Sequence, residues 1–351
     1  MGAFVHAECR VFSCGPPKTR GALPPCEKRD RESANAETLL AGEIKHPVTA
    51  PRVSIVVPCH NGGRFLDGLL ASLGAQTFRD FETIIVDDGS TEAATCEKLK
   101  HLGPEVRVVH QGNRYLPGAR NRGFLEARTE LVLPLDCDDV LEPSFLAETV
   151  PLLENAPPDT AFVFTHTRLA GTLAGVLQHQ LNPFDQLFLN RLPYCMLIRK
   201  SAWQAIGGYD ESMRGGMEDW EFNIRMSRSG LRGIELAKPL FVYSVRPDGM
   251  LLSRTTRMHG TIWRSVRTKH ADLYRMAALV RSWRASRAMP AKVSASMAAG
   301  LLIAAKLLPE APFNKLFFWL LVKTRARRIE RGELQAGGLP GEGASARPDA
   351  T

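Results

Sequence analysis

The fold is decided by the stretch Val53-Ser-Ile-Val-Val-Pro-Cys-His-Asn61, a short run rich in β-branched residues that ends in a proline and a polar turn. A brief run of this kind is typical of a strand that is buried on both faces, as in a parallel sheet. The stretch therefore predicts a buried strand over residues 53–57, with polar side chains just beyond its carboxyl end.

Two later segments have the same form, an apolar strand that ends abruptly in acids. The strand predicted at residues 81–86 leads into Asp87-Asp88-Gly89-Ser90, and the strand predicted at residues 131–135 leads into Asp136-Cys137-Asp138-Asp139. Another strand is expected at 106–110, and helices at 65–73, from residue 91 and at 118–127. Strands and helices that alternate at this spacing indicate parallel βαβ units. The predicted fold class is α/β, with a mainly parallel, Rossmann-like sheet flanked by helices.

The second half of the chain is less regular. Further strands are expected at 161–165, 195–198 and 240–245, and helices at 201–206 and 220–229, with an irregular stretch over 165–195. Helical character then continues from residue 254 to about residue 331. The expected organisation is a mobile extension (1–50), a catalytic-type domain (51–255, with halves 51–160 and 161–255), a basic helical extension (256–335) and a mobile tail (336–351).

Composition and charge exclude several classes of protein. The 351 residues are 44% hydrophobic and 23% charged, which is ordinary for a globular protein and excludes collagen-like, coiled-coil and wholly disordered chains. Seven scattered cysteines with no CxxC pair argue against a disulfide framework and a structural zinc site, and favour a reducing compartment. Residues 254–333 hold 17 Lys and Arg against 4 Asp and Glu, a surplus of 13. Because the formal net charge of the whole chain is +8, the residues outside 254–333 carry a net charge of −5.

The strand-end acids point to chemistry on a phosphate ester. In an open α/β sheet, ligands bind in the crevice beyond the carboxyl ends of the strands, so the three polar loops should converge there. Clustered carboxylates need a positive partner, and their hard oxygen ligands suit Mg²⁺ or Mn²⁺. Such an ion typically neutralises charge on a departing phosphate oxygen. Each motif alone is commonly only a turn or a helix cap.

The motifs taken together resemble the inverting family 2 glycosyltransferases of GT-A fold, over roughly residues 51–255. The matching segments are the first strand and its turn, Ile85-Val-Asp-Asp-Gly-Ser-Thr91, Ala119-Arg-Asn-Arg-Gly123, Leu135-Asp-Cys-Asp-Asp139, Gly207-Gly-Tyr-Asp-Glu211 and Glu218-Asp219-Trp220. The resemblance implies a nucleotide-diphosphate sugar donor, a hydroxyl acceptor, and transfer with inversion at the anomeric carbon.

The resemblance also implies roles for individual residues. Asp88, with Asp87 beside it, would contact the base or ribose, Pro58 and Asn61 would line the same pocket, and Arg120 would lie near the base or diphosphate. Asp136 and Asp138 match the DxD motif that holds the metal and the diphosphate. Asp219 matches the general base, with Glu218 as the rival, and a simple capping role for Asp219 is the alternative.

One position departs from the family pattern. Many relatives have Tyr-x-x-His-Pro after the base, with a histidine that can meet the metal or diphosphate, whereas this chain has Tyr243-Ser-Val-Arg246-Pro247. Arginine does not bind cations but clamps diphosphate directly. Arg246 is therefore expected to bind the donor, with the metal held by carboxylates alone.

The basic C-terminal segment raises the question of a membrane surface. Two apolar runs, 301–308 and 316–322, are too short to span a bilayer, and the second holds Phe317, Phe318 and Trp319 between basic residues. This composition suits an interfacial amphipathic helix, but equally a helix packed on the catalytic domain. No signal peptide is evident, so a cytoplasmic location, peripheral on the inner face of the cell membrane, is expected. No motif indicates nucleic-acid binding.

The sequence thus predicts a transferase that uses a nucleotide-diphosphate sugar, with a UDP-sugar as the expected donor. The expected acceptor is a surface polysaccharide or a lipid-linked glycan. Two alternatives remain. A nucleotidyltransferase would use a similar crevice, but Gly62-Gly63 is too short for its triphosphate loop. A non-catalytic nucleotide-sugar-binding protein fits the departure at Arg246.

Overall fold

The computed structural model describes the backbone of residues 51–247, 249, 259–330 and 334–336. The chain divides into two units, residues 1–48 and 49–351, and the described residues all belong to the second. The extension predicted at 1–50, and the predicted tail beyond residue 336, lie outside the described residues.

Four parallel strands form the part of the sheet that the sequence analysis expected. They lie in the order β3-β2-β1-β4, with β1 at Val53–Cys59, β2 at Phe81–Asp88, β3 at Val106–Gln111 and β4 at Leu131–Pro134. All seven residues of β1 are buried, as expected for a central strand. Val53 pairs in register with Phe81 on one side and with Leu131 on the other, so these strands end at a common edge.

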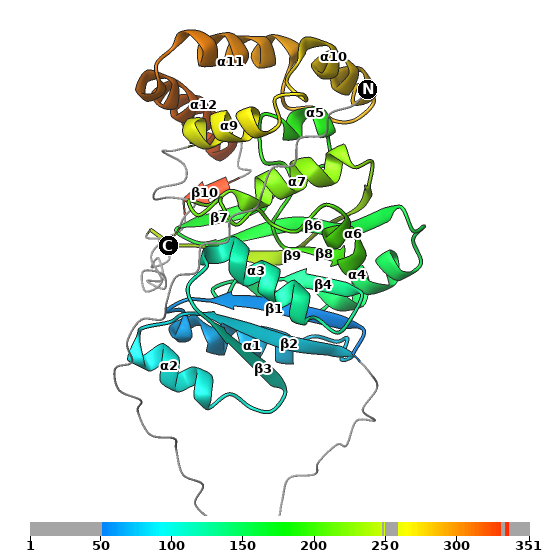
Figure 1. The fold of residues 1–351 in the computed structure, drawn as a ribbon, viewed down its shortest axis with the longest axis vertical. Coiled ribbons are helices and arrows are strands. Elements are labelled where there is room, and N and C mark those ends of the chain that lie inside the picture. The colour runs from blue at the N-terminus through cyan, green and yellow to red at the C-terminus, as the bar shows by residue number, and fades with distance from the viewer. Residues whose placement is uncertain (1–50, 248, 250–258, 331–333, 337–351) are drawn as a thin grey trace, which may run out of the picture. The chain divides into compact units, whose positions relative to one another are not determined.

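Helices cover both faces of this sheet (Figure 1). One core joins Ile55 and Val57 of β1 to α1 (Leu66–Gly74), α2 (Ala93–Lys100) and α4 (Phe145–Glu154). The other joins Val56 to α3 (Tyr115–Glu126), α6 (Lys200–Ala205) and α7 (Glu218–Arg228). At Gly123 a Cβ would lie only 2.0 Å from Val56 Cγ1, so glycine lets α3 approach β1 closely. The expected α/β class, with helices on both faces, is therefore confirmed.

The second half of the domain extends the sheet with mixed strands. Next to β4 come β8 (Met196–Arg199), then β6 (Thr160–Gly171) and β7 (Leu173–Leu177), all paired antiparallel to their neighbours. β9 (Arg232–Val245) pairs parallel with β6 and antiparallel with the short β5 (Val140–Leu141). The stretch 165–195, expected to be irregular, instead holds the end of β6, all of β7 and α5 (Pro183–Gln186), because Gly171 turns the chain at φ 100° into a hairpin.

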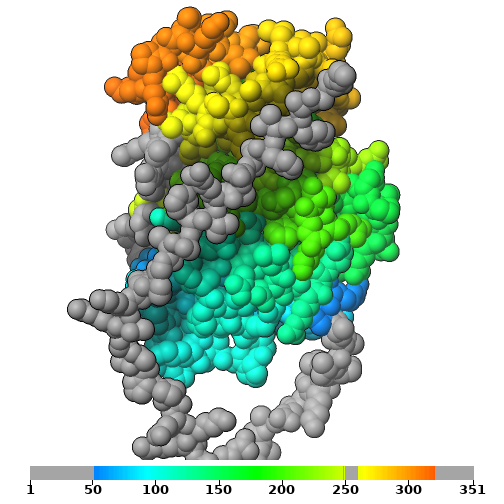
Figure 2. Space-filling model, in the orientation of Figure 1, coloured from blue at the N-terminus to red at the C-terminus, as the bar shows by residue number. Residues whose placement is uncertain are grey.

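The C-terminal segment is helical, as expected, and packs against the domain. It contains α9 (His259–Lys269), α10 (Met276–Ala285), α11 (Ala295–Leu307) and α12 (Glu310–Glu330), with β10 (Leu334–Ala336) added beside β7. Buried Trp263 of α9 donates from Nε1 to the carbonyl of Leu187 at 2.8 Å and packs on Phe313 and Phe317 of α12. Figure 2 shows these helices resting directly on the layer that contains α5 and α7. No helix among the described residues is both long and apolar enough to cross a membrane.

Candidate active site

The three acidic or polar loops predicted from the sequence meet at one edge of the sheet. β1, β2 and β4 run parallel and in register, so the loops after Cys59, Asp88 and Pro134 leave from neighbouring strand ends. Ligands of open α/β sheets bind beyond this edge. The sheet topology thus brings together residues that lie up to about 80 positions apart in the chain.

Asp87 and Asp88 are fixed by hydrogen bonds at the end of β2. Oδ1 of Asp87 accepts from the backbone of Ser90 at 3.0 Å, and its Oδ2 lies 2.9 Å from Nδ1 of His110. Burial acts to raise the pKa of Asp87, but these hydrogen bonds outweigh it and hold the pKa below its usual value. Oδ1 of buried Asp88 accepts from Gln111 Nε2 at 2.7 Å and from the backbone of Arg114 at 2.8 Å.

Asn61 shapes the loop after β1. It adopts a positive φ of 53°, and its Oδ1 accepts from the backbone N–H groups of Thr91 and Glu92 at 2.8 and 2.9 Å, directly before α2. An amide oxygen in this position satisfies the free N–H groups at the start of a helix. The Asn61 side chain therefore joins the loop after β1 to the loop after β2, while Pro58 lines the adjacent cleft.

Arg120 links the first DxD acid to the acidic pair at the start of α7. It is 1% exposed, and its guanidinium donates to Glu218 Oε1 at 2.5 Å and to Asp136 Oδ1 at 2.8 Å. The rings of Tyr194 and Tyr209 lie 4.7 and 5.6 Å from its Cζ. Arg120 thus lies beneath the cleft and supplies positive charge to both carboxylates.

Asp138, the second DxD acid, faces a different arginine. Its Oδ2 lies 2.9 Å from Nη2 of Arg246, whose guanidinium also packs over the ring of Phe65 at 4.1 Å. Two arginines, Arg120 and Arg246, therefore supply positive charge to the clustered acids. The sequence analysis placed both arginines near the donor and did not predict these contacts with the acids.

Asp139 anchors the DxD loop from below. It is buried, accepts a 2.5 Å hydrogen bond from the hydroxyl of Tyr194 and accepts another from the backbone of Ser244 at 2.7 Å. Burial raises the pKa of Asp139 well above its usual value, and the nearby charges of Asp138 and Asp136 add to the effect. These contacts fix the loop to β9 and to the segment before β8.

Asp219 lies at the start of α7, next to Glu218. Its Oδ2 accepts from Nδ2 of Asn190 at 2.7 Å. Burial raises the pKa of Asp219, although Arg120 and the Asn190 hydrogen bond oppose the shift. Burial also raises the pKa of Glu218, to about 7. Both acids thus have pKa values shifted toward neutral pH, as proton-transfer groups require.

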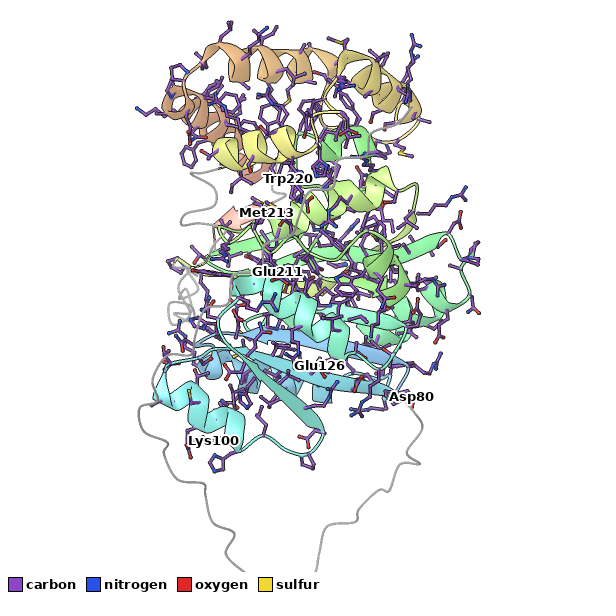
Figure 3. All side chains as sticks on the ribbon, in the orientation of Figure 1. Asp80, Lys100, Glu126, Glu211, Met213 and Trp220 are labelled. Carbon is purple, nitrogen blue, oxygen red and sulfur yellow. The ribbon has the colours of Figure 1, made fainter. Side chains whose placement is uncertain are left out.

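A cleft of about 210 Å³ opens at this edge of the sheet. Its walls include Pro58, His60, Asp88, Asn113, Tyr115 and Glu218. The loop between α6 and α7, which carries Glu211 and Met213 (Figure 3), closes one side of the cleft. Met213 lines the cleft, and Glu211 accepts from Arg114 at 2.5 Å. Trp220, by contrast, points away, into the core shared with the C-terminal helices (Figure 3).

Backbone strain gathers around the same cleft. Among the described residues, Asn61, Tyr115 and Met217 are the non-glycine residues with positive φ, at 53°, 63° and 64°. Tyr115 lines the cleft, Asn61 follows His60 of its wall, and Met217 precedes Glu218. Such backbone conformations are costly and cluster at functional sites. A smaller cavity of about 70 Å³, between α5, α7 and α10, contains none of the predicted site residues.

Several site residues were missed by the sequence analysis. Asn190 and Tyr194 lie in the stretch that had been expected to be irregular, and Tyr115 precedes the predicted helix by three residues. The sequence around a polar loop residue does not predict which side chain it will contact. These residues reach the acids only because of the way the strands pair. The motif Gly207-Gly-Tyr209 was noticed, but not that Tyr209 would pack beside Arg120.

Asp136 and Asp138 are the carboxylates that could hold a divalent cation at this site. No group of three or more His, Cys, Asp or Glu side chains suited to a metal ion occurs within the described ranges. Mg²⁺, however, is commonly held by one or two carboxylates together with substrate phosphates and water. Asp136 and Asp138 meet that requirement.

Known proteins resemble this chain in sequence and in fold. Residues 54–220 match the sequence profile of Glycosyl transferase family 2. A protein named as a glycosyltransferase, EpsH of Bacillus subtilis (strain 168), is 34% identical over 115 residues, which are 32% of this chain and 33% of EpsH. The O-antigen biosynthesis protein RfbC of Myxococcus xanthus is 26% identical over 57% of this chain and 18% of its own length. The chain thus spans a third or less of these two relatives.

A solved structure shares the fold. TarS residues 1–349 of S. aureus, in complex with UDP-GlcNAc, superimposes with a TM-score of 0.54 at 18% identity, covering 83% of this chain and 98% of that one. The structural likeness concerns the fold, and the sequence profile identifies the family. Residues 54–220 therefore form a domain of the family 2 glycosyltransferases, with a GT-A-type fold.

Proposed function

We propose that this protein transfers a sugar from a nucleotide-diphosphate sugar to a hydroxyl acceptor, with inversion at the anomeric carbon. The observation that carries the proposal is the chain of contacts from Asp136 through Arg120 to Glu218, the neighbour of Asp219. These contacts would place a leaving-group site and a base site on two sides of the Arg120 guanidinium. Inverting transfer needs this arrangement, because a single in-line displacement requires a base opposite the leaving diphosphate.

The donor would occupy the cleft beside β1 and β2. Asp88, supported by Asp87, would accept hydrogen bonds from the base or ribose, and Pro58 would contact the base, with Asn61 shaping the loop beside it. Arg120 would act on the donor through Asp136, because its guanidinium is buried beneath the cleft. We propose a UDP-sugar as the donor, in line with the UDP-GlcNAc bound by the fold relative TarS.

Asp136 and Asp138 would hold Mg²⁺ or Mn²⁺ together with the diphosphate. The ion, when bound, neutralises negative charge that develops on the leaving diphosphate. Arg246 lies at the same place and would contact a diphosphate oxygen directly.

Asp219 is the proposed general base. Its carboxylate is positioned by the neutral amide of Asn190, whereas Glu218 is tied to the guanidinium of Arg120 at 2.5 Å. The Arg120 ion pair occupies one oxygen of Glu218, which is buried, whereas Asp219 is partly exposed. The geometry therefore favours Asp219 over Glu218, and gives Glu218 the task of fixing the start of α7.

The C-terminal helices would place the enzyme on a membrane surface. Of the eleven large hydrophobic side chains exposed among the described residues, eight lie between residues 276 and 319. On α10, Met276, Val280 and Trp283 share one exposed side, interspersed with arginines. Exposed apolar groups beside positive charge suit an anionic lipid surface. We infer a role at the inner face of the cell membrane, in surface polysaccharide or lipid-linked glycan synthesis.

A donor screen tests the proposed function. Nucleotide-sugars would be ranked by the thermal stabilisation that they give, with and without Mn²⁺, and the best donor would then be incubated with glycan and lipid-linked acceptors. Release of nucleoside diphosphate supports sugar transfer, whereas release of pyrophosphate would indicate nucleotidyl transfer. Binding without turnover across the acceptor panel would indicate a non-catalytic binding protein.

A further inference from the structure

We propose that Arg246 and a divalent cation compete for Asp138, so that the cation binds the DxD pair only when the Arg246 guanidinium swings away. The displaced guanidinium then contacts the donor diphosphate, a second step that rests on the function proposed above. Arg246 would thus hold the acidic loop in place when the donor is absent and contribute positive charge when it is present.

The position of Arg246 follows from the pairing of β9. Val242 of β9 lies opposite Val140 of β5, directly after the DxD motif, and the backbone of Ser244 donates to Asp139 at 2.7 Å. Arg246 comes two residues after Ser244, directly beyond the last residue of this anchored strand. Its guanidinium therefore reaches Asp138 from a fixed backbone, and the 2.9 Å contact belongs to the architecture of the site.

The two arginines at the DxD motif differ in how easily they can move. The Arg120 side chain is 1% exposed and is held by Glu218 and two tyrosine rings, so it stays with Asp136. The side chains of Arg246 and Asp138 are 29% and 23% exposed. Partly solvated ion pairs are weak, whereas breaking a buried pair is costly. Asp138 is therefore the exchangeable acid and Asp136 the fixed one.

A guanidinium and a metal ion that share one carboxylate repel each other. Both are positive, and arginine stays protonated at every physiological pH, so it yields only by moving. Phe65 offers a surface along which the guanidinium can move, since it packs on the ring at 4.1 Å. When a diphosphate enters the site, the guanidinium and the metal ion can both contact its negative oxygens, and the repulsion between them is reduced.

The test measures Mn²⁺ binding to the full chain by electron paramagnetic resonance, without nucleotide. Replacing Arg246 with glutamine should raise Mn²⁺ affinity by about tenfold or more, because the competing charge is removed. Two matched variants control for charge. Arg232→Gln removes the partner of Asp159 at the start of the same strand, and Arg64→Gln removes the other guanidinium that stacks on Phe65. The first should leave Mn²⁺ affinity unchanged, and the second should change it far less than Arg246→Gln.

The proposed competition between Arg246 and the cation is refuted if Arg246→Gln leaves Mn²⁺ affinity unchanged or lowers it. It is also refuted if Arg64→Gln raises Mn²⁺ affinity as much as Arg246→Gln does. It is also overturned if Asp138→Asn fails to abolish the gain in the Arg246→Gln background. UDP binding in EDTA reports the second step separately, and Arg246→Gln should weaken it by about tenfold or more. If Mn²⁺ responds as expected but no variant binds any nucleotide, the proposed function fails while the competition stands.

Discussion

Replacing Arg120 with methionine removes the cation that contacts both Asp136 and Glu218. The Glu218 side chain is 3% exposed and loses a 2.5 Å partner, so its charge is left buried without compensation. Breaking a buried ion pair from one side costs about 3–5 kcal/mol of the free energy of unfolding. Methionine roughly fills the space between the two tyrosine rings. The fall in the free energy of unfolding should therefore come mainly from the missing positive charge.

The loss should depend on pH in a defined direction. Glu218 already has a folded pKa raised to about 7, above its unfolded value, so its contribution to stability falls as pH rises toward 7. Without Arg120 the folded pKa rises further, because the charge that opposed the shift is gone. The variant then keeps losing stability above pH 7, where the wild type has levelled off. The difference in the free energy of unfolding between the wild type and the variant should therefore grow above pH 7 by about 1.4 kcal/mol per pH unit.

Urea unfolding followed by circular dichroism, at about pH 6 and about pH 8.5, measures both effects. Arg122→Met is the matched control, because Arg122 pairs with Glu126 on the exposed side of the same helix, and it should change stability by less than about 1 kcal/mol. Adding Glu218→Gln to Arg120→Met should remove the pH dependence of this difference in the free energy of unfolding. A loss for Arg120→Met that matches the control, or that is the same at both pH values, would refute the central role of this buried network.

Other changes should separate the roles of the site residues. Asp219→Asn should lower kcat by about 10²-fold or more while leaving donor affinity unchanged, as measured by steady-state kinetics and calorimetry. Asn190→Ala removes a hydrogen bond that favours the Asp219 carboxylate, so the pH below which kcat/KM falls should move up by about 1–2 units. Asp138→Ala should abolish donor turnover with an unchanged circular dichroism spectrum. Met276→Ser with Trp283→Ser should reduce flotation with anionic vesicles, and unchanged flotation would place the membrane contact elsewhere.

The local sequence pattern was enough to predict the first half of the fold. Buried strands such as β1 and β2 read as short apolar runs, and their ends coincide with turns rich in Asp and Gly, so the edge that carries Asp88 and Asp136 was correctly located. The hairpin of β6 and β7 was missed, because Gly171 lies within a mixed run with no clear alternation.

The partners of the site acids could not be predicted in the same way. Arg120 reaches Glu218, 98 residues away, and Arg246 reaches Asp138 only because β9 pairs with β5. Such contacts depend on strand register, which a single sequence does not encode locally. The sequence did mark Arg246 as a departure from the family pattern, but not its ion pair with the second DxD acid.

The most direct test of the account is to locate the nucleotide. Azido-uridine diphosphate would be photo-crosslinked to the full chain in the presence of Mn²⁺, and the labelled peptides mapped by mass spectrometry. We expect labelling of the segments 58–61 and 113–119, which border the cleft, and we expect this labelling to be lost when excess UDP-sugar competes. Labelling that avoids these segments, or that excess UDP-sugar does not displace, would contradict the claim that the strand-end acids form the donor site.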